Sequence, residues 1–257
     1  MTFNPQILGD QFTQSIIDST SLSALDEEQK PANYEQAYAI QDYVFNQLNR
    51  KSSGWKVGLG NKAGMNAFNL PSPAAARMYS DSLYEVGETI AFDPFSKMVV
   101  EFEIIYKIKN RISPTTKIEN PFDFVESTHL GFELIQPHIN DWKTHGAYPF
   151  VAEGIGFSAL VIDPEPMKIS QAELLNSIEI YCDNEVQAKA ATGDNGVDPE
   201  EMLQFLISHC QDNGHTIQAG DLISSGTQTE QFAVTIEDHK IEAKWNGGAT
   251  HFTMTAK

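Results

Sequence analysis

The stretch from Met98 to Ile108 constrains the fold most, because it has the composition and alternation of a β-strand. Every even position is apolar, so we expect that face to pack into a core. The other face carries Val99, Glu101, Glu103, Ile105 and Lys107. Residues two apart share a face about 6–7 Å apart, so the two glutamates lie side by side. Such a pair is either solvated or, if buried, joined by a cation.

Two later observations place a charge where the hydrophobic pattern expects an apolar residue. Glu133 is the only charge in the apolar run His129–Pro137. Lys56 lies in the short apolar segment Gly54–Gly60. This lysine either snorkels toward solvent or is functional, since a desolvated lysine is suited to proton transfer.

Glu101, Glu103 and Glu133 form a candidate site for a hard divalent cation if their segments are neighbours. Three carboxylate oxygens plus water ligands make an octahedral Mg²⁺ or Mn²⁺ site. The all-oxygen ligand set disfavours zinc, which prefers histidine and cysteine. A cation would also supply the positive charge that buried glutamates require.

The charge of the chain narrows the classes of partner. Lys plus Arg total 17 against 35 Asp plus Glu, for a formal net charge of −18. This excess disfavours nucleic acid and anionic membrane surfaces, which attract clustered cations. No apolar run approaches the roughly 18–20 residues of a membrane span, and no signal-peptide pattern is visible. Cys182 and Cys210 are expected to be buried and reduced, which favours the cytoplasm.

The remaining patterns predict helices first and mostly strands later. Helices are expected over residues 6–28, 34–49, 120–128 and 198–211, with irregular chain over 61–84. Hairpins are expected around Asp183-Asn184 and around Asp238-His239. We expect a mostly helical segment, residues 1–75, packed on a core of residues 76–257.

Several short motifs follow one another from residue 34 to the C-terminus. In order they are Tyr34-Glu-Gln-Ala-Tyr-Ala-Ile-Gln41, Trp55-Lys-Val-Gly-Leu59, Glu101-Phe-Glu103, Phe132-Glu133-Leu134, Gly220-Asp-Leu-Ile223 and Ser225-Gly-Thr227. Together they resemble the fumarylacetoacetate hydrolase superfamily, and within it the branch of 2-keto-4-pentenoate hydratases and 4-oxalocrotonate decarboxylases. The resemblance implies an α+β fold with a mixed β core, a β-roll or barrel, and flanking helices.

The resemblance also implies a metal centre. Glu101, Glu103 and Glu133 would ligate Mg²⁺ or Mn²⁺, and the carboxylate and 2-oxo group of a substrate would complete the shell. The metal would then act as a Lewis acid that stabilises negative charge on the oxygen of a dienolate.

The same resemblance suggests the catalytic and substrate-binding residues. Lys56 would handle protons and pair with the substrate carboxylate, and Glu153 is the second expected catalytic residue. Substrate binding is expected from Lys56, Arg77, His138 and Thr227.

Three positions depart from the family pattern. Ala74-Ala75-Ala76-Arg77 stands where the branch commonly has an Asp-Phe-Gly-like run, which removes a candidate acidic proton carrier. Gln136-Pro137-His138 replaces an Asp-Ser-Arg run, and Glu153-Gly154 replaces Asp-Asn. Metal binding is compatible with these changes, whereas the exact reaction does not follow.

The first expected function is a magnesium- or manganese-dependent carbon–oxygen lyase of aromatic catabolism. It would be a hydratase that adds water to a 2-hydroxydienoate or 2-oxo-alkenoate through a metal-bound dienolate. The alternatives are a 2-oxo acid decarboxylase of the same branch, an acylpyruvate C–C hydrolase and a non-catalytic partner subunit. A homo-oligomer is expected, and a partner decarboxylase stays open because family lyases can work in pairs.

Overall fold

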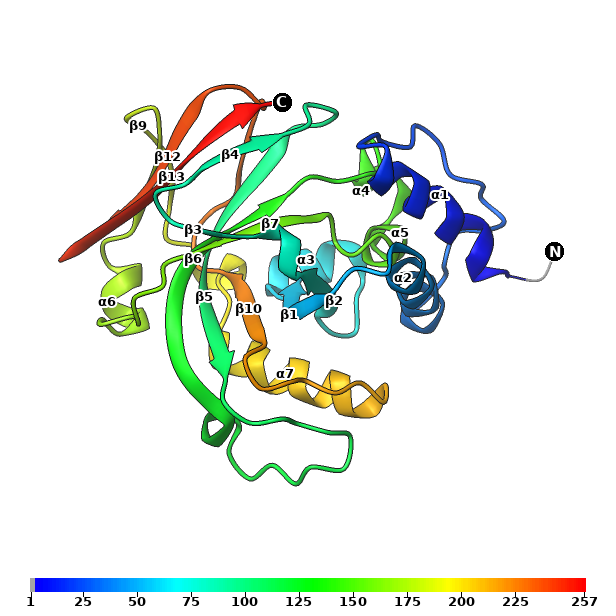
Figure 1. Cartoon of the computed structure of the whole chain (residues 1–257), viewed down its shortest axis with the longest axis horizontal. Helices are drawn as coiled ribbons and strands as arrows, with labels where there is room; N and C mark the ends of the chain where they lie inside the picture. Colours follow the sequence, from blue (N-terminus) through cyan, green and yellow to red (C-terminus); the bar gives the residue numbers. More distant parts are fainter. Residues whose placement is uncertain (1–2) are drawn as a thin grey trace.

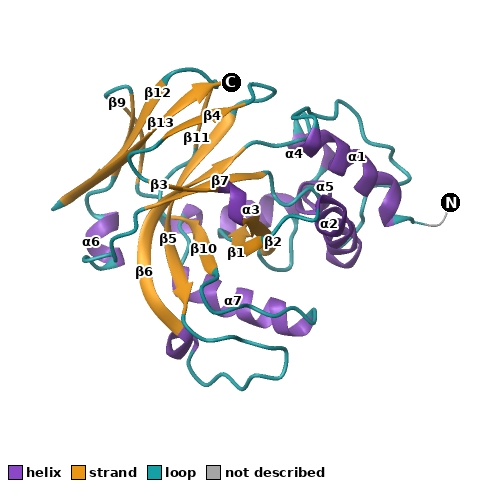
Figure 2. Cartoon of the chain, in the orientation of Figure 1, coloured by secondary structure: helices purple, strands orange, loops and turns teal. Residues whose placement is uncertain are grey.

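A computed structural model describes residues 3–257 and contains two β-sheets with helices beside them (Figure 1). The helices are α1 (Pro5–Ile17), α2 (Tyr34–Leu48), α3 (Lys62–Phe68), α4 (Trp142–His145), α5 (Ala147–Ala152), α6 (Gln171–Leu175) and α7 (Pro199–Asp212). The strands are β1 (Ser52–Gly58), β2 (Ala74–Tyr79), β3 (Leu83–Glu85), β4 (Thr89–Phe92), β5 (Met98–Ile108), β6 (Val125–Ile135), β7 (Phe157–Ile162), β8 (Glu179–Cys182), β9 (Glu185–Lys189), β10 (Leu222–Thr227), β11 (Phe232–Val234), β12 (His239–Trp245) and β13 (Gly248–Ala256). Figure 2 shows the sheets on one side and α1, α2, α4 and α5 gathered on the other.

Strands β5 and β6 lie in the middle of the larger sheet, whose order is β2-β1-β10-β5-β6-β7-β3 with β11 beside β5. The smaller sheet has the order β4-β13-β12-β8-β9. Both sheets are mixed, since β1 runs parallel to β10, β3 parallel to β7 and β13 parallel to β4, whereas pairs such as β5–β6 and β12–β13 are antiparallel. The expected α+β class with a mixed β core and flanking helices is confirmed.

The even-numbered face of β5 packs into the main hydrophobic core, as its alternation predicts. Phe102 contacts Phe132 of β6, and Phe132 contacts Phe252 of β13, with ring centres 5.0 and 5.1 Å apart. The smaller sheet therefore covers this face of the larger one. On the opposite face, Glu101 and Glu103 are also buried, so β5 is covered on both sides.

A second core joins the N-terminal helices to α5. Phe12 of α1, Ile40 of α2 and Val151 of α5 are buried together. Gln41 is the polar member of the α2 stripe, and its Nε2 donates to the backbone oxygens of Ala75 and Val151 at 3.1 and 2.9 Å. The expected packing helix is therefore confirmed, and its one buried amide is satisfied.

The N-terminal part differs from the sequence prediction in two places. The helix expected over residues 6–28 ends at Ile17, and Ser19 has a φ of 50°, in the left-handed region that ends helices. The irregular chain expected over residues 61–84 contains α3 and β2. Strand β2 forms because it pairs with β1 along the edge of the sheet, a long-range contact that local patterns do not show.

The expected domain boundary is also corrected. Strand β1 lies between β2 and β10 in the larger sheet, so the core begins well before residue 76. The division into residues 1–75 and 76–257 falls inside β2. The helical part that precedes the sheet consists of α1 and α2 only.

Two later elements are also corrected. The helix expected over residues 120–128 is only a 3₁₀ turn, Pro121–Phe124, because Val125 already pairs with Ile108 of β5. The hairpin expected around Asp238-His239 does not form as such, since β11 pairs with β5 while β12 pairs with β8 and β13. The hairpin at Asp183-Asn184 and helix α7, capped by Asp198, are confirmed.

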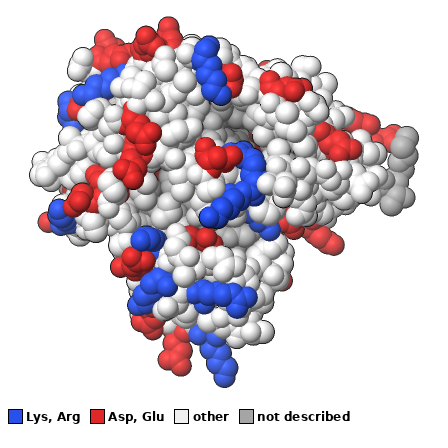
Figure 3. Space-filling model, in the orientation of Figure 1, with Lys and Arg blue, Asp and Glu red and all other residues white. Residues whose placement is uncertain are grey.

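The surface agrees with the acidic composition. Figure 3 shows acidic and basic side chains interspersed over the face in view. Cys182 and Cys210 are free and buried, as expected. None of the helices in residues 3–257 combines the length and the apolar character that crossing a membrane demands.

Candidate active site

The three glutamates of the candidate site lie together on the odd-numbered face of β5 and on its neighbour β6. Glu101 faces Glu133 directly in the strand register, and Glu103 follows on the same face of β5. One ligand atom from each residue lies within 4.8 Å of the other two. Glu101 is 6% exposed, and Glu103 and Glu133 are fully buried. The solvated alternative for this pair is therefore wrong, and the carboxylates form one buried cluster.

Lys56 joins this cluster from β1. Its ammonium forms an ion pair with Oε1 of Glu133, and Nζ also donates to the backbone oxygen of Ile155 at 3.2 Å. The side chain is fully buried, so it does not snorkel to solvent. A buried lysine held among carboxylates can offset part of their repulsion.

The protein holds one oxygen of each carboxylate. Oε2 of Glu103 accepts hydrogen bonds from Ser224 Oγ at 2.5 Å and from the Gly226 backbone N–H at 2.9 Å. Gln231 Nε2 donates to Oε1 of Glu101, and Lys56 holds Oε1 of Glu133. Of the three other oxygens, Oε1 of Glu103 and Oε2 of Glu133 are buried without a hydrogen-bond partner within residues 3–257.

The electrostatics of the cluster show a shortage of positive charge. Burial raises the pKa of Glu101 to about 7, with a further rise from the neighbouring Glu133 carboxylate. Burial and the Glu133 and Glu101 carboxylates also hold the pKa of Glu103 well above its usual range. One ammonium faces three carboxyls in a desolvated place, so ionising all of them leaves excess negative charge.

These observations fit a hard divalent cation. The three carboxyl groups offer only oxygen donors, which suit Mg²⁺ or Mn²⁺ and disfavour zinc. The buried oxygens without partners are the atoms that such an ion would contact. Bound there, the ion would also neutralise the charge that Lys56 leaves uncompensated.

A cavity of about 220 Å³ lies against this cluster. Its polar lining includes Lys56, Glu101, Thr227, Gln231 and Lys143, and its apolar lining includes Val99, Phe68, Trp142, Phe150 and Ile155. Among the described residues that line it, Lys56, Lys143 and Glu101 are the only ones with a charged side chain. The cavity therefore joins the glutamates and the lysine to a largely apolar chamber for a small organic molecule.

Comparison with known structures identifies the fold. One similar structure is 4-oxalocrotonate decarboxylase from Pseudomonas putida G7, complexed with magnesium and adipate. The TM-score is 0.81 at 15% sequence identity, and the match covers 98% of this chain and 97% of that chain. The chain has the fold of the fumarylacetoacetate hydrolase superfamily. The resemblance seen in the sequence motifs is thus confirmed at the level of the fold.

Two other structures of this superfamily fold match less completely. Fumarylpyruvate hydrolase from Pseudomonas aeruginosa, in complex with Mn²⁺ and pyruvate, has a TM-score of 0.52 at 14% identity, over 79% of this chain and 89% of that chain. The 5-carboxymethyl-2-hydroxymuconate delta-isomerase from Mycobacterium smegmatis has a TM-score of 0.54 at 14% identity, over 80% of both chains. By sequence, no family model and no curated protein matches the chain.

Of the expected substrate-binding residues, Lys56 and Thr227 line the cavity beside the glutamates. Thr227 is 5% exposed and pairs with Glu103 in the β10–β5 register, which places it beside the glutamate cluster. Its Oγ1 donates to the backbone oxygen of Thr229 at 2.9 Å. The structure therefore brings both residues to the carboxylates.

Arg77 lies on the other face of the sheet. It pairs with Trp55 in the register of β1 and β2, whereas Lys56 pairs with Ala76. Neighbouring residues of a strand point to opposite faces, so Arg77 points away from Lys56. Its guanidinium binds Asp42 at 2.5 Å and lies over the ring of Trp55. Arg77 therefore does not lie beside the glutamates, and its substrate-binding role stays a prediction.

His138 and Glu153 lie in a different cavity, of about 270 Å³, which Arg77 also lines. The His138 ring stacks on Phe95, and its Nδ1 lies 2.8 Å from the Thr20 backbone oxygen. His138 therefore packs against the N-terminal segment rather than beside the glutamates. Its expected substrate-binding role likewise stays a prediction.

Glu153 keeps the features of a functional carboxyl despite this different location. Its Oε2 accepts the His138 backbone N–H at 2.7 Å, and its buried Oε1 has no partner in the described part of the chain. Burial raises its pKa to about 8, although the hydrogen bond from His138 and the charge of Lys56 lower it in part. Glu153 thus lies within the electrostatic reach of Lys56 but lines the neighbouring cavity.

Sequence reasoning missed four contributors to the site. Ser224, Gly226 and Gln231 orient the carboxylates, and Lys143 lines the cavity. The motif Ser225-Gly-Thr227 pointed to the right turn but not to the hydrogen bonds it makes. Those bonds depend on the pairing of β10 with β5 across more than a hundred residues of chain.

Proposed function

We propose that the chain is a divalent-metal-dependent enzyme that acts on a small 2-oxo acid in the cavity beside Lys56 and Glu101. The observation on which this rests is the convergence of three buried carboxylates, with oxygens left unpaired, next to a buried lysine. Relatives of the same fold are described as complexes with magnesium and with Mn²⁺ and pyruvate, which supports the proposal.

Mg²⁺ or Mn²⁺ held by Glu101, Glu103 and Glu133 would supply a Lewis acid that withdraws electron density from the 2-oxo group. The residues of the chain do the rest. Ser224 and Gln231 fix the orientation of the carboxylates, and the apolar wall excludes water from the reacting carbon. Lys56 can pair with a substrate carboxylate and deliver a proton from Nζ.

The reaction that best fits this lining is decarboxylation. The carbon–carbon bond to a carboxylate breaks, CO₂ leaves, and the electron pair is taken up by the conjugated 2-oxo group before a proton from Lys56 adds to carbon. Such a step needs an electron sink and a proton donor but no base to activate water. The substrate's 2-oxo group would be the electron sink and Lys56 the proton donor, and the structural match to a decarboxylase covers nearly the whole chain.

Hydration is the second candidate, and Glu153 is the observation that favours it. Addition of water to a dienoate needs a base, and a carboxyl with a pKa of about 8 and a free oxygen suits that role. The obstacle is the position of Glu153 in the neighbouring cavity.

A carbon–carbon hydrolase needs a similar base. A non-catalytic subunit, a homo-oligomer, a partner decarboxylase and a cytoplasmic location stay predictions.

The test is turnover by the purified chain with Mg²⁺ or Mn²⁺ on a panel of 2-oxo acids and 2-hydroxydienoates. We expect CO₂ release from an unsaturated 2-oxo acid bearing a second carboxylate, and loss of that activity with EDTA. Water addition to a dienoate without CO₂ release would favour the hydratase. An absence of metal-dependent turnover across the whole panel would contradict the proposal.

A further inference from the structure

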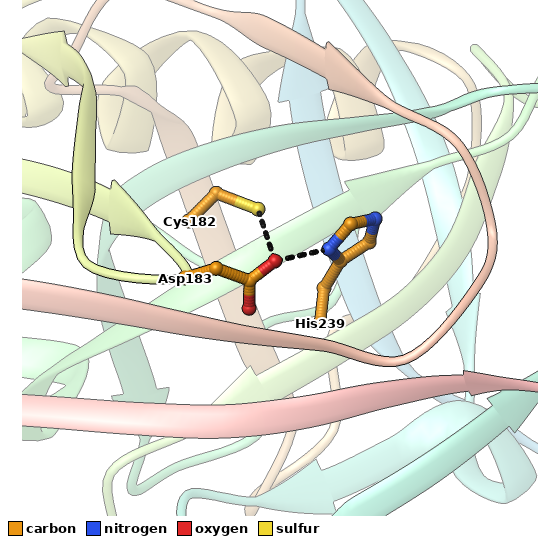
Figure 4. Close-up of side chains that lie close together, drawn as sticks. All are labelled: Cys182, Asp183 and His239. Carbon is orange, nitrogen blue, oxygen red and sulfur yellow. Dashed lines mark hydrogen bonds and ion pairs between the residues drawn. The ribbon is translucent and has the colours of Figure 1, made fainter.

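A second cluster of metal-ligating side chains lies in the smaller sheet, far along the chain from the glutamates. Cys182 ends β8, Asp183 lies in the turn to β9, and His239 begins β12. Figure 4 shows the cysteine sulfur and a ring nitrogen of the histidine both directed at the Asp183 carboxylate. Oδ2 of Asp183 is 2.5 Å from His239 Nδ1 and 3.8 Å from Cys182 Sγ. The three ligand atoms lie within 4.8 Å of one another.

The backbone fixes the carboxylate of this cluster. Asp183 has a φ of 50°, in the left-handed conformation of the tight turn. Its backbone N–H donates to the Lys240 oxygen at 3.0 Å, and Oδ1 accepts the Lys240 N–H at 2.9 Å. One carboxylate oxygen is therefore held by β12, and the other is left to face the sulfur and the imidazole.

A second carboxylate lies near the far side of the histidine ring. The other ring nitrogen, Nε2, is buried without a hydrogen-bond partner in the described chain and lies 3.5 Å from Oε1 of Glu237. Metal-binding histidines usually donate their second ring N–H to a carboxylate, which sets the tautomer and strengthens the ligand. The Glu237 carboxylate is separate from the three inner donors and lies near enough to this nitrogen to take that role when an ion binds.

We propose that Cys182, Asp183 and His239 bind a zinc ion. A thiolate, an imidazole and a carboxylate are the donor set that zinc prefers, unlike the oxygen-only glutamate cluster. With Zn–S about 2.3 Å and Zn–O about 2.0 Å, tetrahedral geometry places sulfur and oxygen about 3.5 Å apart, close to the 3.8 Å observed. The nitrogen and oxygen must separate from 2.5 Å to about 3.3 Å as the ion replaces their hydrogen bond.

The fourth position would hold water, because the Asp183 side chain is 51% exposed and the cluster opens to solvent. Binding releases the thiol proton of Cys182 and the imidazole proton that faced Asp183 to the solvent. The ion would clamp the β8–β9 turn onto the start of β12. This site is independent of the proposed decarboxylase activity, since it shares no residue with the glutamate cluster.

Cobalt(II) tests the proposal directly, because a cobalt–thiolate bond gives a charge-transfer absorption in the near ultraviolet that an oxygen-only site does not give. We expect this band when Co²⁺ is added to the purified full chain, and its displacement by one equivalent of Zn²⁺. Cys182→Ser should abolish the band, and His239→Gln should weaken Co²⁺ binding by at least tenfold. Cys210→Ser, which changes the other buried cysteine, is the matched control and should keep the band.

The result that overturns the proposal is equally specific. If the wild-type chain gives no charge-transfer band, or if Cys182→Ser and Cys210→Ser give the same band, the cluster is only an aspartate–histidine pair. Circular dichroism of each variant checks that the fold is retained. If Cys182→Ser does not fold, His239→Gln and Cys210→Ser decide the question. Co²⁺ binding that is at least tenfold weaker in folded His239→Gln, with the band retained in Cys210→Ser, supports the site. Full-affinity Co²⁺ binding by His239→Gln contradicts it.

Discussion

The two clusters of metal-ligating side chains differ in their burial and in how far their charges are balanced. The glutamate cluster is buried in the middle of the larger sheet and gathers three carboxyls around one lysine. The Cys182–Asp183–His239 cluster lies at the ends of β8 and β12 in the smaller sheet, where Asp183 and His239 already form a hydrogen bond. Because it is buried, the glutamate cluster depends on an added cation. The Cys182–Asp183–His239 cluster is already hydrogen-bonded, so an ion binds there only by replacing those hydrogen bonds.

The two clusters also differ in their donor atoms. Oxygen donors on rigid central strands suit a hard ion that polarises a substrate. Sulfur and nitrogen donors at a turn suit a soft ion that holds chain segments together. The comparison therefore predicts that the two clusters respond to different metals and that variants in one leave the other intact.

The largest expected effect comes from Glu103→Gln. The amide can still accept the hydrogen bonds of Ser224 and Gly226, so the fold should persist, but one anionic metal ligand is lost. We expect metal-dependent turnover to fall by about a thousandfold or more, in line with the several kcal/mol that a Lewis acid contributes. Glu126→Gln, an exposed change on the same β6 strand that holds Glu133, is the control in steady-state kinetics. Equal activity of Glu103→Gln and Glu126→Gln would remove the metal role of the cluster.

The next effect is expected from Lys56→Met, which keeps the length of the side chain. Loss of the proton donor should lower kcat by about 10²–10⁴-fold. The metal-free variant should also lose about 3–5 kcal/mol of unfolding free energy, because Glu133 is left buried without a cation. Added Mg²⁺ should restore much of that stability but not the rate. A variant that loses only stability would make Lys56 a packing residue.

A fourth buried carboxyl, Glu153, sharpens the comparison because no cation contacts it in the described chain. Its folded pKa of about 8 lies above the ordinary value of 4.5, so the folded state binds the proton more tightly than the unfolded state. The stability due to this proton is present below about pH 4.5 and is lost as pH rises toward 8. We expect Glu153→Gln to remove a few kcal/mol of this pH dependence in denaturant titrations. An unchanged slope between pH 5 and about 8 would contradict the burial argument.

The smallest expected effect concerns the outer carboxylate of the second cluster. Glu237→Gln leaves all three proposed zinc ligands in place but removes the negative charge that lies 3.5 Å from Nε2 of His239. We expect zinc affinity to fall about tenfold in competition with a chromophoric chelator, with Mn²⁺ binding at the glutamates unchanged. A fall in Mn²⁺ affinity, or no change in zinc affinity, would break the proposed separation of the two clusters.

Local alternation was enough to predict much of the fold and the inner site. It placed Glu101 and Glu103 on one face of a strand, and the apolar run around Glu133 identified the second segment. The strand β5 and the helix α2 were predictable because each buries a periodic stripe. These features depend on neighbours in sequence, and so they are visible without a structure.

The errors come from long-range pairing. Arg77 is one residue removed from the position opposite Lys56, and that single step reverses the face it occupies. The hairpin expected around His239 failed because β8 and β13 offer better partners to β12 than the nearby β11 does. That same long-range pairing brings His239 to Asp183, which is why the second cluster was not anticipated from the sequence.

The most direct test of the central claim is a crystal structure grown with Mn²⁺ and measured at a wavelength where manganese scatters anomalously. We expect one strong peak about 2 Å from a carboxylate oxygen of each of Glu101, Glu103 and Glu133, beside the cavity lined by Lys56. A well-ordered structure in which manganese binds only elsewhere, with the three glutamates unchanged and unligated, would contradict the assignment.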